Sequence, residues 1–277
     1  MLRAVLFDLD DTLLGNSMDT FVPAYFRALT RYLGHLIPPE RLIAQLMRGT
    51  EAMDANHDGQ RTNQEAFASA FYPNLGVDRS TVERVLGRFY AEEFPELQTL
   101  TRVRPEARLL VERALDEGLQ VVIATNPLFP RVAIEHRLAW AGVPVEAFEY
   151  ALVTTYETMH ATKSHPAYYR EILRRIGRRP DECLMVGDSW ERDVIPATSV
   201  GLYVYWITEE DEPTSLDVRP LPGGSRSSVA SFVQIAAGQL HKDSHPLSAS
   251  GLLVGHGKLA ELLEGVRERG AFQEAWG

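Results

Sequence analysis

The stretch AVLFDLDDTLL, residues 4–14, decides the fold of this chain. Its apolar residues predict a buried strand over 4–9, and side chains along a strand alternate between the two faces of the sheet. Asp8 and Asp10 therefore share a face, while Asp11 points the other way. Carboxylates held this close together oppose folding, because like charges disfavour one another's ionised form. The crowding indicates that positive charge is brought in among them.

Four more apolar runs predict buried strands, and helical patterns separate the runs. These strands are expected over 119–125, 150–155, 183–187 and 202–207. The intervening helices are expected over 105–118, 130–142, 166–177 and 191–201. Strands that alternate with helices in this way predict an α/β fold, a doubly wound parallel sheet covered on both faces.

Residues 17–99 contain no strand pattern, which predicts a helical domain inserted between the first and second strands. Helical stretches lie over 19–36, 39–53, 63–72 and 80–94. After residue 207 we expect a loop to about 227, a helix near 228–240, and then a linker and one amphipathic helix. The predicted organisation is a Rossmann-like core of residues 1–16 and 100–240, an insert of residues 17–99, and a C-terminal segment of residues 241–277.

The composition excludes several classes of function. The chain has 28 basic and 38 acidic residues, a net charge of −10, which argues against a nucleic-acid or anionic-membrane binder. The single cysteine, Cys183, cannot form an intrachain disulfide and fits a reducing compartment. No apolar run approaches the roughly 20 residues of a membrane span, and the N-terminal run meets acidic residues too early for a signal peptide. We expect a cytoplasmic protein.

Polar residues follow the predicted strands at the points where they end. Thr125 ends the second strand and Asn126 follows it, Lys163 comes after the third, and Asp188 and Asp193 follow the fourth. The carboxyl ends of parallel strands meet at one edge of the sheet, where ligands bind in open α/β folds. Each residue alone is typical of a turn or helix cap, but together with Asp8 and Asp10 they predict a functional site.

These motifs resemble those of the haloacid dehalogenase-like hydrolase superfamily, in order, from residue 4 to about 207. The first motif of that family, Asp-x-Asp-x-Thr, is matched by DLDDT at 8–12. The second is matched by Thr125, the third by Lys163, and the acidic fourth by Gly187, Asp188 and Asp193. The helical insert lies where one class of the family carries its cap domain.

The resemblance implies a magnesium-dependent phosphatase that acts on a small phosphorylated metabolite. Asp8 would attack phosphorus and form an aspartyl-phosphate, and Asp10 would act as general acid and base. Thr125, the Asn126 backbone N–H and Lys163 would hold the phosphoryl group. Mg²⁺ would be bound by Asp8, the Asp10 carbonyl and the acidic pair Asp188 and Asp193. Thr12 would stabilise the loop after the first strand.

Other functions share parts of this pattern. A dehalogenase of the same fold lacks the second acid of the first motif, so Asp10 favours phosphoryl transfer. A phosphonate-cleaving relative needs a lysine in the cap, and residues 17–99 contain none. A phosphomutase remains an alternative, because the difference lies in how the cap excludes water. A signalling receiver domain would need its phosphoacceptor where this chain has Thr154 and Thr155, and a non-catalytic phosphoryl-binding protein should have lost a motif.

A second motif lies in the insert, at DANHDGQRTNQE, residues 54–65. Asp54, Asp58 and Glu65 match the spacing of a calcium-binding EF-hand loop. The same letters also give a turn followed by a Thr62 to Glu65 capping box at the start of the next helix, and Arg61 stands at a position that is usually apolar in such loops. Both interpretations stay open. His57 and His160 are further candidates for contacts with a substrate.

Overall fold

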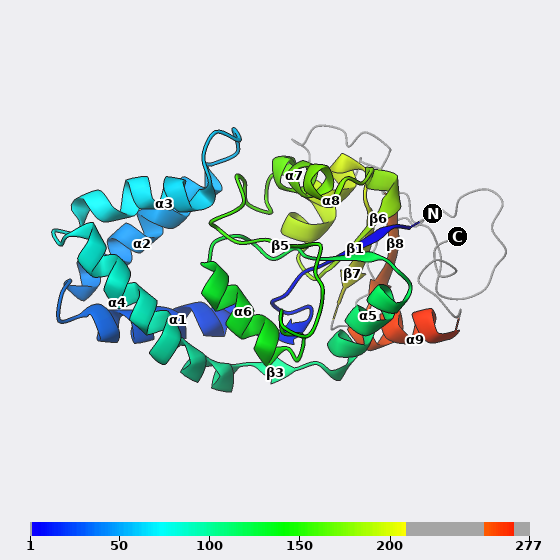
Figure 1. Ribbon diagram of the computed structural model, residues 1–277, viewed down its shortest axis with the longest axis horizontal. Helices are drawn as coiled ribbons and strands as arrows, with labels where there is room; N and C mark the ends of the chain where they lie inside the picture. Colours follow the sequence, from blue (N-terminus) through cyan, green and yellow to red (C-terminus); the bar gives the residue numbers. More distant parts are fainter. Residues whose placement is uncertain (1, 209–251, 269–277) are drawn as a thin grey trace.

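The computed structural model describes residues 2–208 and 252–268, and its centre is a six-stranded parallel sheet. The order across the sheet is β5-β4-β1-β6-β7-β8, with β1 at the middle (Figure 1). The strands are β1 (Ala4–Phe7), β4 (Gln120–Ile123), β5 (Leu152–Val153), β6 (Cys183–Gly187), β7 (Tyr203–Ile207) and β8 (Leu252–Gly257). The predicted doubly wound α/β fold is confirmed.

The third predicted strand is shorter than expected. We predict it over residues 150–155, but β5 contains only Leu152–Val153. The backbone N–H of Thr154 still donates to the carbonyl of Ile123, at 3.0 Å. The Thr154 hydroxyl donates to the carbonyls of Ile123 and Thr125. Side-chain hydrogen bonds to β4 and the residues after it therefore hold the chain where β5 ends.

The C-terminal segment contributes a strand as well as the predicted helix. β8 pairs in parallel with β7, from Tyr203 opposite Leu252 to Ile207 opposite Gly257. We expect only a linker and a helix here, so this strand was missed. The helix is α9 (Leu259–Glu268). The helix predicted near 228–240, and the loop before it beyond Thr208, lie outside the described residues.

Helices cover both faces of the sheet because the strands are apolar on both sides. Val5 and Phe7 of β1 belong to one hydrophobic cluster, and Ala4 and Leu6 belong to another. The first cluster includes side chains of α5 (Pro105–Asp116), α6 (Arg131–Trp140) and α9. The second includes side chains of α7 (Pro166–Ile176) and α8 (Ile195–Val200). Each Å² of apolar surface buried in these clusters contributes about 25 cal/mol to the free energy of unfolding.

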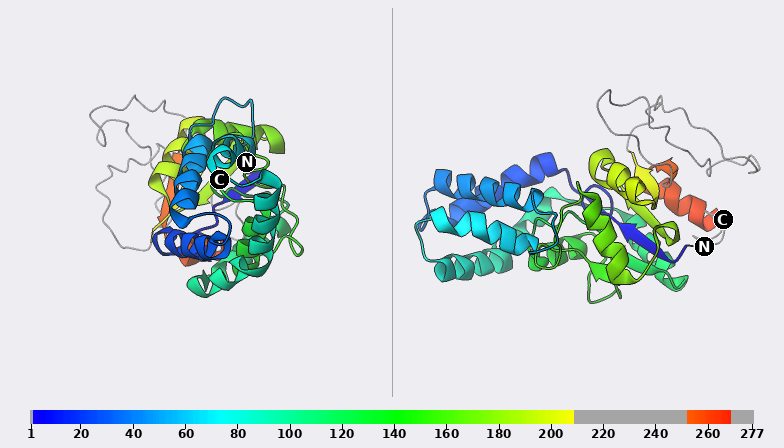
Figure 2. Two further views of the ribbon diagram at one scale, coloured as in Figure 1. Left: turned by 90° about the vertical axis from the view of Figure 1, so that its left-hand side faces the viewer. Right: turned by 90° about the horizontal axis from the view of Figure 1, so that it is seen from above.

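The insert forms a group of helices at the end of the molecule toward which β1 runs (Figures 1 and 2). Its elements are α1 (Met18–Leu33), α2 (Pro39–Asp54), α3 (Asn63–Phe71) and α4 (Arg79–Glu92), with 3-10 turns η1 (Tyr72–Asn74) and η2 (Phe94–Leu100). A short antiparallel ribbon joins the chain where it enters and leaves the insert, formed by β2 (Leu14–Gly15) and β3 (Arg102–Val103). The residue boundaries of the two domains stay a prediction.

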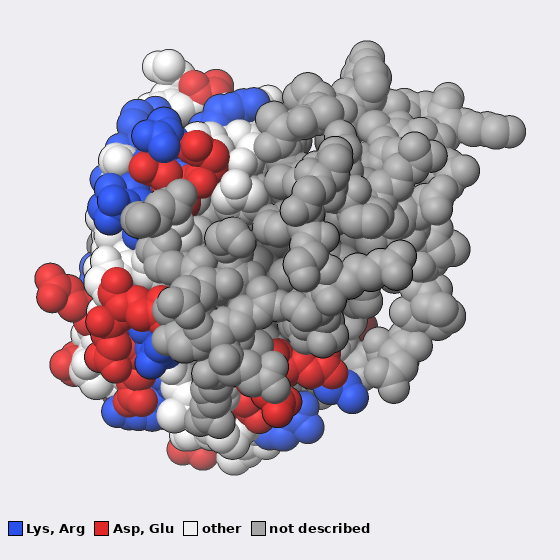
Figure 3. Space-filling view, turned by 90° about the vertical axis from the view of Figure 1, so that its right-hand side faces the viewer, with Lys and Arg blue, Asp and Glu red and all other residues white. Residues whose placement is uncertain are grey.

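Aromatic residues connect the insert to the core. Phe21 and Tyr25 of α1 contact Phe94 at ring-centroid distances of 6.0 and 6.1 Å. Phe94 stacks on Trp140 of α6 at 5.5 Å, so the hydrophobic cluster runs from the insert into the core. On the face shown in Figure 3, the described basic and acidic side chains are interspersed. In the described part of the chain, no helix has the length and hydrophobicity needed to cross a membrane.

Candidate active site

Asp8 lies at the end of β1 and pairs with Lys163. The Asp8 backbone N–H donates to the carbonyl of Val186, at 2.9 Å, so Asp8 is held between β1 and β6. Lys163 Nζ donates to Asp8 Oδ1 at 2.7 Å and also forms an ion pair with Asp193. Only 2% of the Lys163 side chain is exposed. Asp8 therefore meets Lys163 and Asp193, which lie more than 150 positions further along the chain, in one buried cluster.

A left-handed turn follows Asp10. Asp11 has a φ of 56°, a conformation that Asp and Asn tolerate better than other residues with a side chain. Its Oδ1 accepts a hydrogen bond from the backbone N–H of Asn16. Asp11 is thus a turn residue. Thr12 is buried, and its hydroxyl donates to Asp188 Oδ1 at 3.4 Å, so this residue also touches the fourth motif.

The fourth motif is held by a π-helical turn, η4 (Trp190–Val194). The Ser189 carbonyl accepts from the backbone N–H groups of both Asp193 and Val194, at 2.7 and 3.2 Å. Asp193 Oδ2 accepts from the Ser189 N–H at 3.0 Å. The turn directs the buried Asp193 carboxylate toward Gly187, where a Cβ would collide with it. Glycine is therefore required at the end of β6 for Asp193 to reach the cluster.

The carboxylates of Asp8, Asp188 and Asp193 offer oxygen atoms that all lie within 4.8 Å of one another. Hard oxygen donors at this spacing suit Mg²⁺, which binds carboxylates together with water. Lys163 forms ion pairs with two of the three carboxylates, those of Asp8 and Asp193. The donor set therefore fits a divalent cation.

The electrostatics of the trio agree with this fit. Burial raises the pKa of Asp8 well above its usual range, and Asp193 and Asp188 raise it further against the opposing effect of Lys163. Burial and the charge of Asp193 raise the pKa of Asp188 to about 6. Burial alone would lower the pKa of Lys163. The negative charges of Asp193 and Asp8 have the larger effect, so the pKa of Lys163 is raised. The site holds more negative charge than one lysine balances, which a divalent cation would correct.

Thr125 and Asn126 come just after β4, the strand that pairs in parallel with β1. Thr125 is buried, and its carbonyl accepts from the hydroxyls of Thr154 and Tyr168 at 2.8 and 2.9 Å. The Asn126 side-chain oxygen accepts from the backbone N–H of Lys163, at 3.2 Å. Asn126 thus links the second motif to the third. We assign it a backbone role from the sequence and did not anticipate this side-chain contact.

Asp10 differs from the other acids of the site. Its side chain is not among the three carboxylates that converge, and it contacts Asn16 and Arg137 instead. The predicted use of its carbonyl as a metal ligand stays a prediction. Sequence reasoning missed Arg137, which has no motif around it, and Asn16. The one signal for Arg137 is its position on the face of α6 that carries the apolar Ala133, Ile134 and Leu138.

Asn63 is another residue that sequence reasoning missed. It is fully buried at the start of α3, and its side-chain N–H₂ donates to the carbonyls of Pro127 and Ala161 at 3.3 and 3.2 Å. Its backbone N–H donates to the carbonyl of Met159 at 2.8 Å. One side chain of the insert therefore holds both the loop after Thr125 and the loop before Lys163.

The loop over residues 54–65 does not gather its carboxylates. Asp54 Oδ1 accepts from Thr162 and Ser164 of the core, and Asp58 Oδ1 accepts from the backbone N–H of Gln60. Glu65 completes the capping box with Thr62. Within the described residues, the trio of Asp8, Asp188 and Asp193 is the group of acids that converges as metal ligands do. The capping-box interpretation is confirmed, and the geometry gives the calcium interpretation no support.

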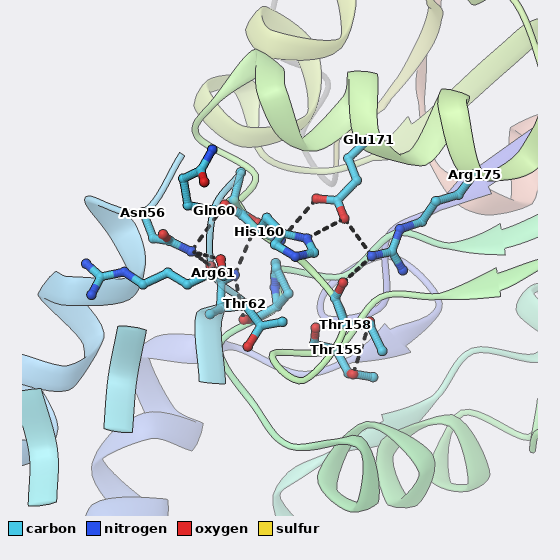
Figure 4. Close-up of polar contacts among 12 residues, drawn as sticks. Asn56, Gln60, Arg61, Thr62, Thr155, Thr158, His160, Glu171 and Arg175 are labelled. Atoms are coloured by element: carbon cyan, nitrogen blue, oxygen red, sulfur yellow. Dashed lines mark hydrogen bonds and ion pairs between the residues drawn. The ribbon is translucent and has the colours of Figure 1, made fainter. Parts of the chain in front are cut away.

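The two candidate histidines lie on either side of the junction between insert and core. His57 stacks on His165 with ring centroids 4.6 Å apart. Figure 4 shows His160 between the insert loop at Asn56 and the buried Glu171 of α7. His160 Nδ1 lies 2.8 Å from Glu171 Oε1, and the Asn56 side chain donates to the His160 carbonyl at 3.2 Å. These contacts give both histidines structural roles at the interface.

Comparison with known proteins agrees with this geometry. The family model for haloacid dehalogenase-like hydrolases matches residues 2–201. The chain is 27% identical over 247 residues to a phosphoserine phosphatase of Thermus thermophilus, covering 79% of this chain and 95% of that protein. It is 28% identical over 207 residues to a phosphoglycolate phosphatase of Rhodospirillum rubrum, covering 74% and 78%.

A solved structure shares the fold. The 2-haloacid dehalogenase of Pseudomonas syringae superposes with a TM-score of 0.50 at 20% identity, covering 77% of this chain and 91% of that one. The family match extends over most of the chain and includes all four predicted motifs. The chain therefore belongs to the haloacid dehalogenase-like hydrolase family and is a hydrolase.

Proposed function

We propose that this hydrolase is a magnesium-dependent phosphatase that cleaves a small-molecule phosphate monoester through an aspartyl-phosphate on Asp8. The observation that carries the proposal is the buried cluster in which Lys163 pairs with Asp8 and Asp193 beside Asp188. The named phosphatases to which the chain is similar support the same class of substrate. The single, buried thiol of Cys183 supports a cytoplasmic enzyme.

In the first half of the reaction, an Asp8 carboxylate oxygen forms a bond to phosphorus as the bond from phosphorus to the ester oxygen breaks. Asp10 gives a proton to the departing oxygen, so an alcohol leaves. Thr125 and the Asn126 N–H bind a phosphoryl oxygen, and Lys163 balances charge between Asp8 and the transferred group. Bound Mg²⁺, held by Asp8, Asp188 and Asp193, would reduce the repulsion between two anions.

In the second half, Asp10 takes a proton from a water molecule as its oxygen attacks phosphorus. The bond between phosphorus and the Asp8 oxygen breaks, which releases inorganic phosphate and restores the carboxylate. Asp10 therefore returns to its starting protonation state after each turnover, and no other reactant is needed. The presence of Asp10 favours this chemistry over halide displacement, which has no alkoxide to protonate.

The test is hydrolysis of an aryl phosphate by the purified protein with and without Mg²⁺. Asp8→Asn should abolish turnover, because an amide is a poor nucleophile and a poor ligand. Asp181→Asn, at an exposed site in the turn η3 (Pro180–Glu182), is the matched control and should keep wild-type turnover. Mass spectrometry after a rapid acid quench should find the phosphoryl group on the peptide that contains Asp8. Full activity of Asp8→Asn would contradict the proposal.

A further inference from the structure

Both oxygens of the Asp10 carboxylate are held by other side chains. Asn16 Nδ2 donates to Oδ1 at 2.7 Å, and Arg137 Nη1 donates to Oδ2 at 2.5 Å. Asn16 lies in the loop just before the insert begins, whereas Arg137 belongs to α6 of the core. A carboxylate with one donor on each oxygen has its plane and its direction fixed.

Arg137 is itself rigidly held and depends on Asp10. Only 1% of its side chain is exposed. Its guanidinium lies over the ring of Phe129 at 4.5 Å, and its Nε donates to the carbonyl of Ala133 at 3.3 Å. An arginine cannot lose its charge in a protein, so burying one is costly unless a carboxylate pairs with it. Asp10 supplies that carboxylate.

The two residues that hold Asp10 are not optimised for stability. Arg137 Nη2 and Asn16 Oδ1 are buried polar atoms without a hydrogen-bond partner among the described residues. A buried polar group left unpaired costs about 1–3 kcal/mol. An apolar residue of similar volume would avoid that cost, and paired buried charges are often replaced in this way without loss of stability.

We propose that Arg137 is a positioning residue for Asp10: together with Asn16, it fixes the orientation of the Asp10 carboxylate. The inference rests on the proposed function, in which Asp10 exchanges a proton with the leaving oxygen. Without Arg137, the hydrogen bond from Asn16 to one carboxylate oxygen would leave the Asp10 side chain free to rotate. A catalytic group displaced by about 1 Å loses on the order of 100-fold in rate.

The test compares Arg137→Met, Asp10→Asn and the double variant with aryl and alkyl phosphates whose leaving alcohols differ in acidity. We expect Arg137→Met to lower kcat about 10- to 100-fold for poor leaving groups, with KM changed less than about twofold. The loss should shrink for good leaving groups, which need little protonation. In the Asp10→Asn background, the same substitution should lower kcat by less than about twofold, since there is no acid left to position.

Two further variants complete the design. Arg137→Lys keeps the positive charge but loses the planar guanidinium group, so it should be more active than Arg137→Met. If Arg137→Met does not fold, Arg137→Lys takes its place in the comparison. Arg131→Met removes an arginine from the same helix, where it pairs with the partly exposed Glu135, and should behave as wild type. Urea denaturation of the same set should show coupling between positions 10 and 137.

The outcomes separate the two proposals. Losses that multiply in the double variant, or a loss equal for every leaving group, would overturn the positioning role and leave the phosphatase assignment intact. Wild-type kcat in Arg137→Met would do the same. A wild-type protein that hydrolyses none of the phosphate esters would overturn the proposed function, and this inference with it.

Discussion

Gly187 and Asp193 lie so close together that the site has no room for a Cβ between them. Gly187→Ala should push the Asp193 carboxylate away from Lys163 and from the other two acids, because the added Cβ would collide with that carboxylate. The carboxylate belongs to a short side chain and accepts a hydrogen bond from the backbone N–H of Ser189, so it has little freedom to move aside. We expect turnover to fall at least about 10-fold, because a displaced group is a poorer catalyst. The Mg²⁺ concentration needed for half-maximal activity should rise. Steady-state assays over a range of Mg²⁺ concentrations measure both.

Gly87→Ala is the matched control for that change. Gly87 lies inside α4, and a Cβ added there meets no atom within 4 Å. This substitution should keep full activity and raise the free energy of unfolding by roughly 0.5–1 kcal/mol, since alanine is the better helix former. If both variants lose activity alike, the close contact at Gly187 is not the cause.

Magnesium should stabilise the protein more at neutral than at acidic pH. The pKa of Asp188 is raised to about 6 in the folded protein, so in the absence of Mg²⁺ its ionisation lowers stability as the pH rises from about 4 to 6. Mg²⁺ binds the ionised carboxylates. The increase in melting temperature on adding Mg²⁺ should therefore be small near pH 5 and grow as the pH passes 6.

Asp188→Asn provides the comparison for the magnesium experiment. This variant lacks both the ligand charge and the titrating group, so its melting temperature should respond weakly to Mg²⁺ at every pH. Asp181→Asn, at an exposed position, should respond as the wild type does. A magnesium-dependent shift of equal size from about pH 5 to 8 would show that Asp188 is not a ligand.

Asn63→Ala should weaken the connection between the insert and the core. The change leaves the carbonyls of Pro127 and Ala161 without their donor, at a cost of about 1–3 kcal/mol in the free energy of unfolding. Turnover should also fall, because these carbonyls belong to the loops that carry Asn126 and Lys163. Asn74→Ala, at an exposed position in η1, is the control for urea denaturation and kinetics. Equal stability of the two variants would contradict this role for Asn63.

The capping box at the start of α3 should stabilise the protein, and the loop over residues 54–65 should not bind calcium. Thr62→Ala should lower the free energy of unfolding by about 1 kcal/mol, whereas Thr99→Ala at an exposed position should not. Titration calorimetry with calcium should give the same result for the wild type and for Glu65→Gln. A heat that survives Asp8→Asn and disappears in Glu65→Gln would restore the calcium interpretation.

Local patterns in the sequence were sufficient to predict five of the six strands and the convergence of Asp8, Lys163 and Asp193. The apolar runs mark the strands, and parallel strands place their carboxyl ends at one edge, so residues far apart in sequence are brought together by topology alone. The Thr62 capping box was predictable for a similar reason, since its two members lie three residues apart on one helix turn.

The side chains that support the site could not be predicted in the same way. Arg137 pairs with Asp10 across 127 positions, and Asn63 reaches Ala161 across 98. Neither residue belongs to a motif, and each occupies an ordinary helical position. Their partners are fixed by how α6 and α3 pack, which depends on the whole hydrophobic cluster. β8 was missed because its short, glycine-rich run carries little strand signal on its own.

The last strand determines what a shortened form of this protein would expose. β7 has the sequence YVYWI, with no charged residue, and β8 covers one of its two lateral edges. Cutting the chain after Thr208 would open that edge and uncover the surface on which Leu259 and Leu262 of α9 are buried. An uncharged, aromatic edge strand is a template for intermolecular pairing. A fragment trimmed there keeps every predicted catalytic residue, yet it should assemble into insoluble aggregates.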